Sequence, residues 1–152
     1  MCYITLLSTT STTDLAPSNT GLVQWSRKLP GIPEERFLAF PHQWLIGSKS
    51  GCSCDFRHLY ISSVDLGFGE PEEWFPEEAD DIEATLQVIA TVRALVEKDE
   101  SVDIVDAWPN AEERPLDGTI EVNLGEVSNR AFRFFENHRF IFINQNGEGS
   151  LT

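Results

Sequence analysis

The sequence predicts a single α+β domain, in which two to three helices pack on one face of a mixed or mostly antiparallel sheet. The chain has 152 residues, which is the usual size of one domain. Segments with the alternation of strands outnumber segments with a helical period. Signals for tight turns occur among signals for helical connections, and this mixture favours α+β over a purely parallel sheet.

The predicted strands are short segments rich in β-branched and aromatic residues. In the segment 101–108 we expect Val102, Ile104 and Asp106 to share one face, and in the segment 119–124 the apolar side chains alternate in the same way. Phe56–Ser62 fits either a short strand or one turn of helix. The remaining predicted strands are Cys2–Ser8, Gln43–Ser48, Ser101–Trp108, Thr119–Leu124 and Arg139–Asn144.

The clearest predicted helix runs from Glu77 to Lys98. Apolar residues recur in it at three- and four-residue spacing, and acidic residues crowd its first turns, where the helix dipole favours anions. We therefore expect one buried stripe, and the change Leu86→Ala is expected to cost about 2–5 kcal/mol of stability. The residues of this stripe are Ile82, Leu86, Ile89 and Val92.

Two shorter helices are predicted over residues 22–29 and 128–136, where apolar side chains also recur at three- and four-residue spacing. Between the elements, residues 63–76 form a long surface loop that we expect Trp74 and Phe75 to anchor. No repeat or linker interrupts the sequence, so residues 1–152 are predicted to be one domain with a polar tail from about residue 145.

The charge balance bears on the kind of partner. The chain carries 25 acidic and 11 basic residues, a formal net charge of −14. Nucleic-acid affinity comes largely from Lys and Arg that displace counterions, so the sequence argues against nucleic acid and against anionic membranes. The negative charge either keeps the protein soluble or recognises a basic protein partner.

The cellular compartment is predicted from the cysteines and from hydropathy. The chain has three Cys, an odd and low number for a secreted domain that depends on disulfides. It has no apolar run of the roughly 20 residues that a membrane-spanning helix needs. The sequence therefore predicts a cytoplasmic protein.

The densest chemical motif is the segment 51–58, which contains Cys52, Cys54 and His58. Thiolate and imidazole are the usual ligands of zinc, and a closed zinc site needs four. Cys2 or His42 is the candidate for the fourth ligand. One residue separates the two Cys of the motif, whereas zinc sites typically have two to four there, so the spacing argues against a zinc site of the common type.

The same motif has two other interpretations. Lys49, Arg57 and His58 flank the two cysteines, and a cationic setting would lower the pKa of a thiol and make it a nucleophile or a redox group. Alternatively, Cys52 and Cys54 are small, inert side chains in a tight loop.

These observations leave two hypotheses for function. The favoured one is a non-catalytic binding protein with an acidic surface, and the acidic stretch from Asp65 to Glu83, with Trp74 and Phe75 among its charges, is the candidate surface. The alternative is a small metal- or thiol-dependent enzyme centred on Cys52, Cys54 and His58. No motif resembles a known family closely enough to imply an activity.

Overall fold

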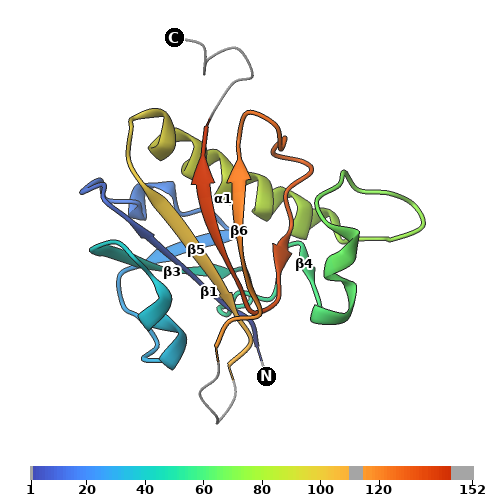
Figure 1. Cartoon of the computed structure of the whole chain (residues 1–152), viewed down its shortest axis with the longest axis horizontal. Coiled ribbons are helices and arrows are strands. Elements are labelled where there is room, and N and C mark those ends of the chain that lie inside the picture. Colours follow the sequence, from blue (N-terminus) through green and yellow to red (C-terminus); the bar gives the residue numbers. More distant parts are fainter. Residues whose placement is uncertain (1, 110–114, 145–152) are drawn as a thin grey trace.

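The computed structural model describes residues 2–109 and 115–144, which fold around a six-stranded mixed sheet (Figure 1). The strand order is β2-β3-β1-β5-β8-β6, and neighbouring strands are antiparallel except for β6 and β8, which are parallel. The strands are β1 (Ile4–Thr9), β2 (Val23–Ser26), β3 (His42–Ser48), β5 (Val102–Ala107), β6 (Gly118–Asn123) and β8 (His138–Ile143).

A smaller two-stranded parallel sheet lies beside the large one. It pairs β4 (His58–Leu59) with β7 (Phe134–Phe135). The other elements are a single α-helix among the described residues, α1 (Ala79–Glu97), and three short 3-10 helices: η1 (Ala16–Ser18), η2 (Pro33–Phe37) and η3 (Ile61–Leu66).

The two central strands are covered on both faces. In β1, Leu7 faces the larger hydrophobic core, which α1 and a group of phenylalanines complete, whereas Leu6 faces a smaller core on the other side of the sheet. In β5, Ile104 and Val105 divide in the same way. Alternate strand residues point to opposite faces, and because both faces are covered every side chain of β5 is buried, including those of Asp103 and Asp106. Figure 1 shows α1 crossing one face of the sheet.

The predicted α+β class is confirmed, but the predicted number of helices is wrong. One long helix packs on the sheet among the described residues, in place of two to three. The long predicted strands all occur with ends shifted by one or two residues, and the segment 56–62 contains both β4 and the start of η3. The predicted polar tail lies outside the described residues.

The predicted helix over residues 22–29 is wrong because this segment pairs with β3. Val23 and Trp25 are buried while Gln24 is exposed, which is the alternation of a half-buried strand. Leu22 and Leu29 pack against different cores. One helical stripe could not place both of them, so strand pairing prevails over the local period.

The predicted helix over residues 128–136 is also wrong. The backbone N–H groups of Phe134 and Glu136 donate to the carbonyl oxygens of Arg57 and Leu59, at 2.8 Å and 3.0 Å. These donors are therefore used between strands and are not available to a helix.

The helix α1 lies within the predicted bounds, but its buried stripe is rotated. Ile82 and Leu86 are only partly buried, while Ile89 and Val92 are fully buried as predicted. The complete set of buried side chains is Ala84, Thr85, Val88, Ile89, Val92 and Leu95. The sequence thus predicted the helix correctly and its inward face only in part.

The described residues include no helix that is both long and apolar enough to cross a membrane.

Candidate functional site

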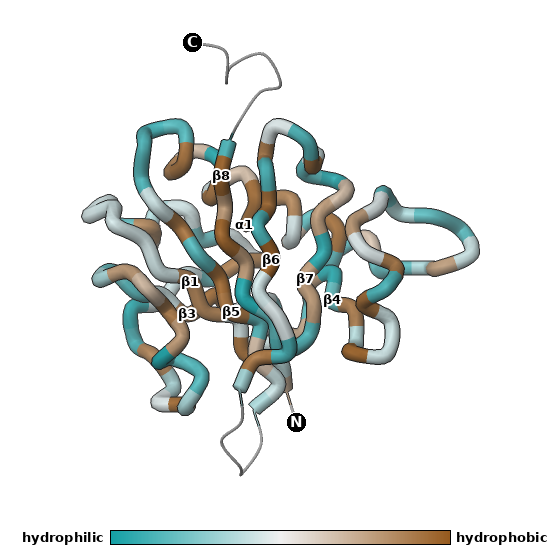
Figure 2. Tube along the Cα trace, viewed as in Figure 1, coloured by the Kyte–Doolittle hydropathy of each residue, from teal (hydrophilic) through white to brown (hydrophobic). Residues whose placement is uncertain are grey.

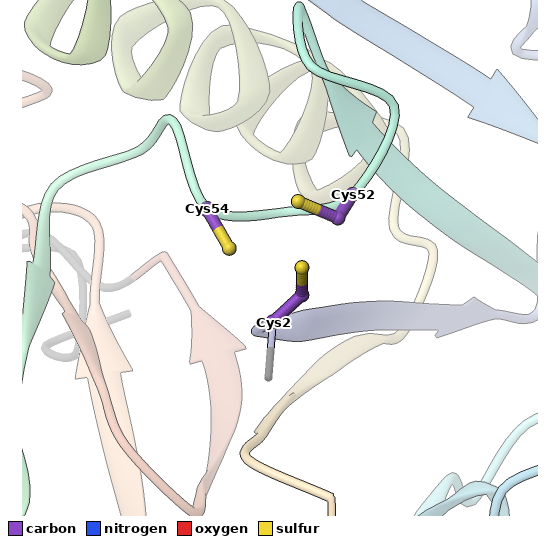
Figure 3. A group of neighbouring side chains, drawn as sticks. All are labelled: Cys2, Cys52 and Cys54. Carbon is purple, nitrogen blue, oxygen red and sulfur yellow. The ribbon is translucent and has the colours of Figure 1, made fainter.

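Three cysteine side chains meet where the chain enters β1. The sulfur atoms of Cys2, Cys52 and Cys54 all lie within 4.8 Å of one another. Figure 3 shows the three side chains pointing into the same space, with Cys2 at the start of β1 and the other two on the loop that follows β3. Cys2 is exposed and the two loop cysteines are partly buried. No disulfide links them, so all three thiols are available to a ligand.

Ser53, between the two loop cysteines, holds this loop against the sheet. Its N–H donates to the carbonyl of Tyr3 at 3.1 Å, and its hydroxyl donates to the carbonyl of Ile46 at 2.6 Å. The same hydroxyl accepts the N–H of Thr5 at 2.9 Å. The Ser53 side chain is turned toward the sheet, whereas the sulfurs of Cys52 and Cys54 point toward one another and toward Cys2 (Figure 3).

A tight turn brings the chain from β3 back to this position. The N–H of Gly51 donates to the carbonyl of Ser48 at 2.9 Å, and Gly51 has a φ of +92°, a region that favours glycine. The Ser48 hydroxyl lies 2.8 Å from a carboxylate oxygen of Asp55 and closes the loop from its other end. The loop that carries the thiols is therefore fixed by hydrogen bonds at both ends.

The protonation of the thiols is set by burial and by the thiols themselves. Burial raises the pKa of Cys54 to about 12, and its hydrogen bond with Cys52 adds to this effect. Burial acts in the same direction on Cys52, but hydrogen bonds with Cys54 and Cys2 outweigh it and lower the pKa of Cys52. The backbone N–H of Tyr3 also donates to the sulfur of Cys54 at 3.3 Å. Within this group the thiol of Cys52 is therefore more easily deprotonated than that of Cys54.

The cationic side chains that flank the two cysteines, Lys49 and Arg57, form ion pairs with carboxylates and not with the thiols. Lys49 forms an ion pair with Asp80 at 3.0 Å. Arg57 is buried and makes two hydrogen bonds to the carboxylate of Glu77, each at 2.8 Å. Both cations are therefore engaged by carboxylates of the 77–80 segment. The sequence suggested that nearby positive charge lowers the pKa of a thiol here, but the pKa of Cys52 is lowered by hydrogen bonds with the other cysteines.

His58 is held away from the thiol group by two hydrogen bonds. Its Nδ1 lies 2.8 Å from a carboxylate oxygen of Asp106, and its Nε2 lies 2.6 Å from the carbonyl oxygen of Ser53. The ring also stacks on Tyr3, with 3.9 Å between ring centroids. Both ring nitrogens face oxygen atoms, so neither offers a lone pair to a metal in this arrangement. A ligand role for His58 stays a prediction that would require these bonds to break.

Of the two candidates for a further ligand, Cys2 is the one that joins Cys52 and Cys54. His42 pairs with Thr9 at the far end of β1. A strand rises about 3.3 Å per residue, so His42 lies roughly 20 Å along the strand from Cys2. His42 is therefore outside the site.

A pocket of about 470 Å³ adjoins the thiol group, because Cys54 lines both. Its wall also contains the rings of Tyr3, His58, Tyr60 and Phe75. The first residues of α1 and the segment before it add Glu77, Glu78 and Asp81. The pocket is within the size range of small-ligand sites.

Neither the protein-family models, nor the curated proteins, nor the solved structures contain a match to this chain.

Sequence reasoning missed the residues that position the site. The role of Ser53, Tyr3 and Asp106 depends on contacts between segments far apart in the chain, which no local pattern indicates. The sequence did give one signal for Asp106. The strand pattern places it on the same face as Val102 and Ile104, so a carboxylate is expected in the apolar layer of the sheet. The structure buries that carboxylate completely, with hydrogen bonds from Thr5 and His58.

Proposed function

We propose that the protein binds a thiophilic metal ion, with zinc as the first candidate, through Cys2, Cys52 and Cys54. The observation that carries this proposal is the approach of the three sulfur atoms to within 4.8 Å of one another. Zinc–sulfur bonds are about 2.3 Å long, so the sulfurs of a tetrahedral site lie about 3.8 Å apart. The thiols need to close by only about 1 Å to reach that geometry.

The donor set supports a thiophilic ion over a hard one. Thiolates select zinc, Cu(I) or iron–sulfur clusters, whereas Mg²⁺ and Ca²⁺ prefer oxygen ligands. Three sulfurs match the coordination number of Cu(I) in thiolate sites, and for zinc they leave one of four positions open. An open position is the arrangement of a catalytic zinc site. The shared wall between Cys54 and the 470 Å³ pocket favours a metal-dependent enzyme as the second candidate function.

The proposal predicts that zinc binds to the purified, reduced protein with one ion per chain. Each of the changes Cys2→Ser, Cys52→Ser and Cys54→Ser should weaken binding by more than about 100-fold, because losing even an outer-shell partner typically costs 10–100-fold. The measurement is competition with a chromophoric chelator, repeated with Cu(I) under anaerobic conditions. His42→Gln, far from the thiols, is the matched control and should bind as the unaltered protein does.

The pH dependence of binding gives an independent check. Burial raises the pKa of Cys54 to about 12, so at neutral pH a metal must displace its proton. Zinc affinity should therefore rise with pH and binding should release protons into a weak buffer. Affinity that does not change with pH would argue against coordination by the thiols.

Alkylation distinguishes the remaining interpretations of the thiols. With zinc bound, Cys52 and Cys54 should be protected until a chelator is added, as read by mass spectrometry. If alkylation is fast with or without metal, the site is a reactive thiol group, and if both stay unmodified without metal the cysteines are inert. His58→Gln tests the ligand predicted from the sequence, and loss of zinc in a variant with an unchanged fold would place His58 in the site.

Spectra of the cobalt-substituted protein test the second candidate. An open fourth position should bind added imidazole and change the visible spectrum, whereas a closed site should not respond.

A further inference from the structure

The exposed hydrophobic residues of the structure gather in one part of the chain. Four large apolar side chains are exposed among the described residues, and all belong to the segment 60–74: Tyr60 (61%), Ile61 (42%), Leu66 (41%) and Trp74 (64%). The sequence predicted that Trp74 anchors its loop, but the structure places it in solvent. Single exposed apolar residues are ordinary, whereas several within one short segment are a candidate for an interaction site.

The segment that carries them lies outside the main sheet. Figure 1 shows η3 and the loop that follows it projecting from the body of the molecule beyond β4. Figure 2 shows both hydrophilic and hydrophobic stretches along this projection. Tyr60 and Phe75, at its two ends, both line the 470 Å³ pocket, and the ring of Trp74 lies 5.8 Å from that of Phe75. We call this pocket, with Tyr60 and Trp74 beside it, the acidic aromatic surface.

The charge of this surface is strongly negative. Residues 65–83 include nine carboxylates and no Lys or Arg: Asp65, Glu70, Glu72, Glu73, Glu77, Glu78, Asp80, Asp81 and Glu83. Some of them are neutralised within the chain, since Glu77 pairs with Arg57 and Asp80 with Lys49. Within the described ranges, Glu73, Glu78 and Asp81 have no cation at ion-pair distance.

The pocket itself has an excess of negative charge. Its wall contains three carboxylates and one Arg. Arg57 is saturated, because its guanidinium also donates to the carbonyl oxygens of Gly69 and Phe132 in addition to Glu77. Glu78 and Asp81 are therefore not compensated by it, and they lie in the same wall as the aromatic rings.

We propose that the acidic aromatic surface is the docking site for a protein partner with a basic surface, and that an Arg or Lys side chain of that partner enters the pocket. Carboxylates and the face of an exposed aromatic ring such as that of Tyr60 are groups that hold a cation. The ring of Phe75 already has the guanidinium of Arg133 over it, at 5.3 Å. The exposed Trp74 and Tyr60 supply the apolar contact that anchors an interface, and the surrounding acids steer a basic partner toward it.

Charge also argues against other occupants. Nucleic acids, phosphorylated peptides and anionic lipid surfaces would meet the same carboxylates and be repelled. A second copy of this chain would present its own acidic segment, since each copy carries a net charge of −14. A partner of opposite charge is what complements this surface. The proposal does not depend on a metal at the thiols.

The probe for this proposal is a short capped peptide of alternating Arg and Gly, added to the full chain at physiological ionic strength. We expect its NMR chemical-shift changes to centre on Trp74, Tyr60 and the start of α1. A peptide of the same length with Glu in place of Arg should cause no changes. Shifts that centre on another face, or no binding at all, would overturn the proposal.

Matched variants separate a defined site from general attraction between opposite charges. The double change Glu78→Gln with Asp81→Asn removes two carboxylates from the pocket and should weaken peptide binding by about tenfold. The control, Glu97→Gln with Glu121→Gln, removes two exposed carboxylates elsewhere and should have an effect of less than about twofold. Equal losses in the two pairs would show diffuse attraction and would refute the proposed site. Trp74→Ala, an exposed change, should weaken binding without altering the fold.

Discussion

Ser53 and Asp106 illustrate how single residues position the candidate site. Ser53 fixes the loop through its N–H and its hydroxyl, and its carbonyl oxygen lies 2.6 Å from the ring of His58. Asp106 holds the other nitrogen of that ring. The two oxygens keep His58 beside Tyr3 and out of the thiol group. Residues that bind no ligand thus determine which of the residues in the 51–58 motif can do so.

Asp81 provides a prediction at this scale. Burial, followed by the charge of Asp55, raises its pKa from 3.8 to about 6, although Lys49 acts in the opposite direction. The folded state then holds this proton more tightly than the unfolded state. The resulting contribution to stability is fully present below about pH 4 and is lost as the pH rises through about 6.

The change Asp81→Asn removes the carboxylate that is disfavoured at neutral pH. We therefore expect the melting temperature of the variant, relative to the unaltered protein, to be higher at pH 7.5 than at pH 4. Thermal melts of both proteins at the two pH values measure this difference. If the melting temperatures of the two proteins differ by the same amount at both pH values, the raised pKa of Asp81 is contradicted.

At the scale of single elements, α1 shows what an apolar period does and does not specify. The spacing of apolar residues and the acids of the first turn define the helix and its direction, and both were predicted. The period is compatible with more than one inward face, because apolar residues also occur beside the stripe. Packing against the sheet selects the face through Val88 and Val92, both with no exposed surface.

The rotated stripe changes the expected cost of core substitutions. Ile89 has no exposed surface, so Ile89→Ala should destabilise the protein by about 2–5 kcal/mol. Leu86 is partly buried and is not a member of either hydrophobic core, so the matched change Leu86→Ala should cost about half as much or less. Urea denaturation of both variants measures the two values. Equal losses would mean that Leu86 belongs to the core after all.

At the scale of the whole molecule, two groups of acidic residues can be distinguished: buried carboxylates that are paired within the fold, and the acids of the 65–83 segment. Buried carboxylates such as Asp103 are paired, here with Arg139 at 2.7 Å, and they belong to the fold. The acids of the 65–83 segment are concentrated beside exposed aromatic residues. The surface that we propose for a basic partner is therefore also the surface least suited to a phosphate backbone.

We expect no binding of DNA or RNA at physiological salt. Arg57 and Arg139 are held by buried or partly buried carboxylates, so they are not available to phosphates. Fluorescence anisotropy with a labelled duplex and a labelled single strand is the measurement. Micromolar affinity that falls steeply with added salt would contradict this expectation.

Much of the strand content followed from the sequence because alternation and β-branched composition are local signals. The expectation that Ile120, Val122 and Leu124 share a face is confirmed, since all three contact the larger core. The segments 22–29 and 128–136 failed because short apolar runs fit both periods. Pairing with β3 and with β4 decided them, and neither partner is near in sequence.

By itself, the sequence determined the mixed class, the direction of the one long helix, the acidic charge and the loop that carries two thiols. The tertiary structure alone decided that Cys2 completes the thiol group, that His58 binds Asp106, and that Arg57 binds Glu77. The physical reason is that composition and period act along the chain. A site, in contrast, depends on side chains that strand pairing brings together from distant positions, and for Cys2 and Cys54 that pairing is β1 with β3.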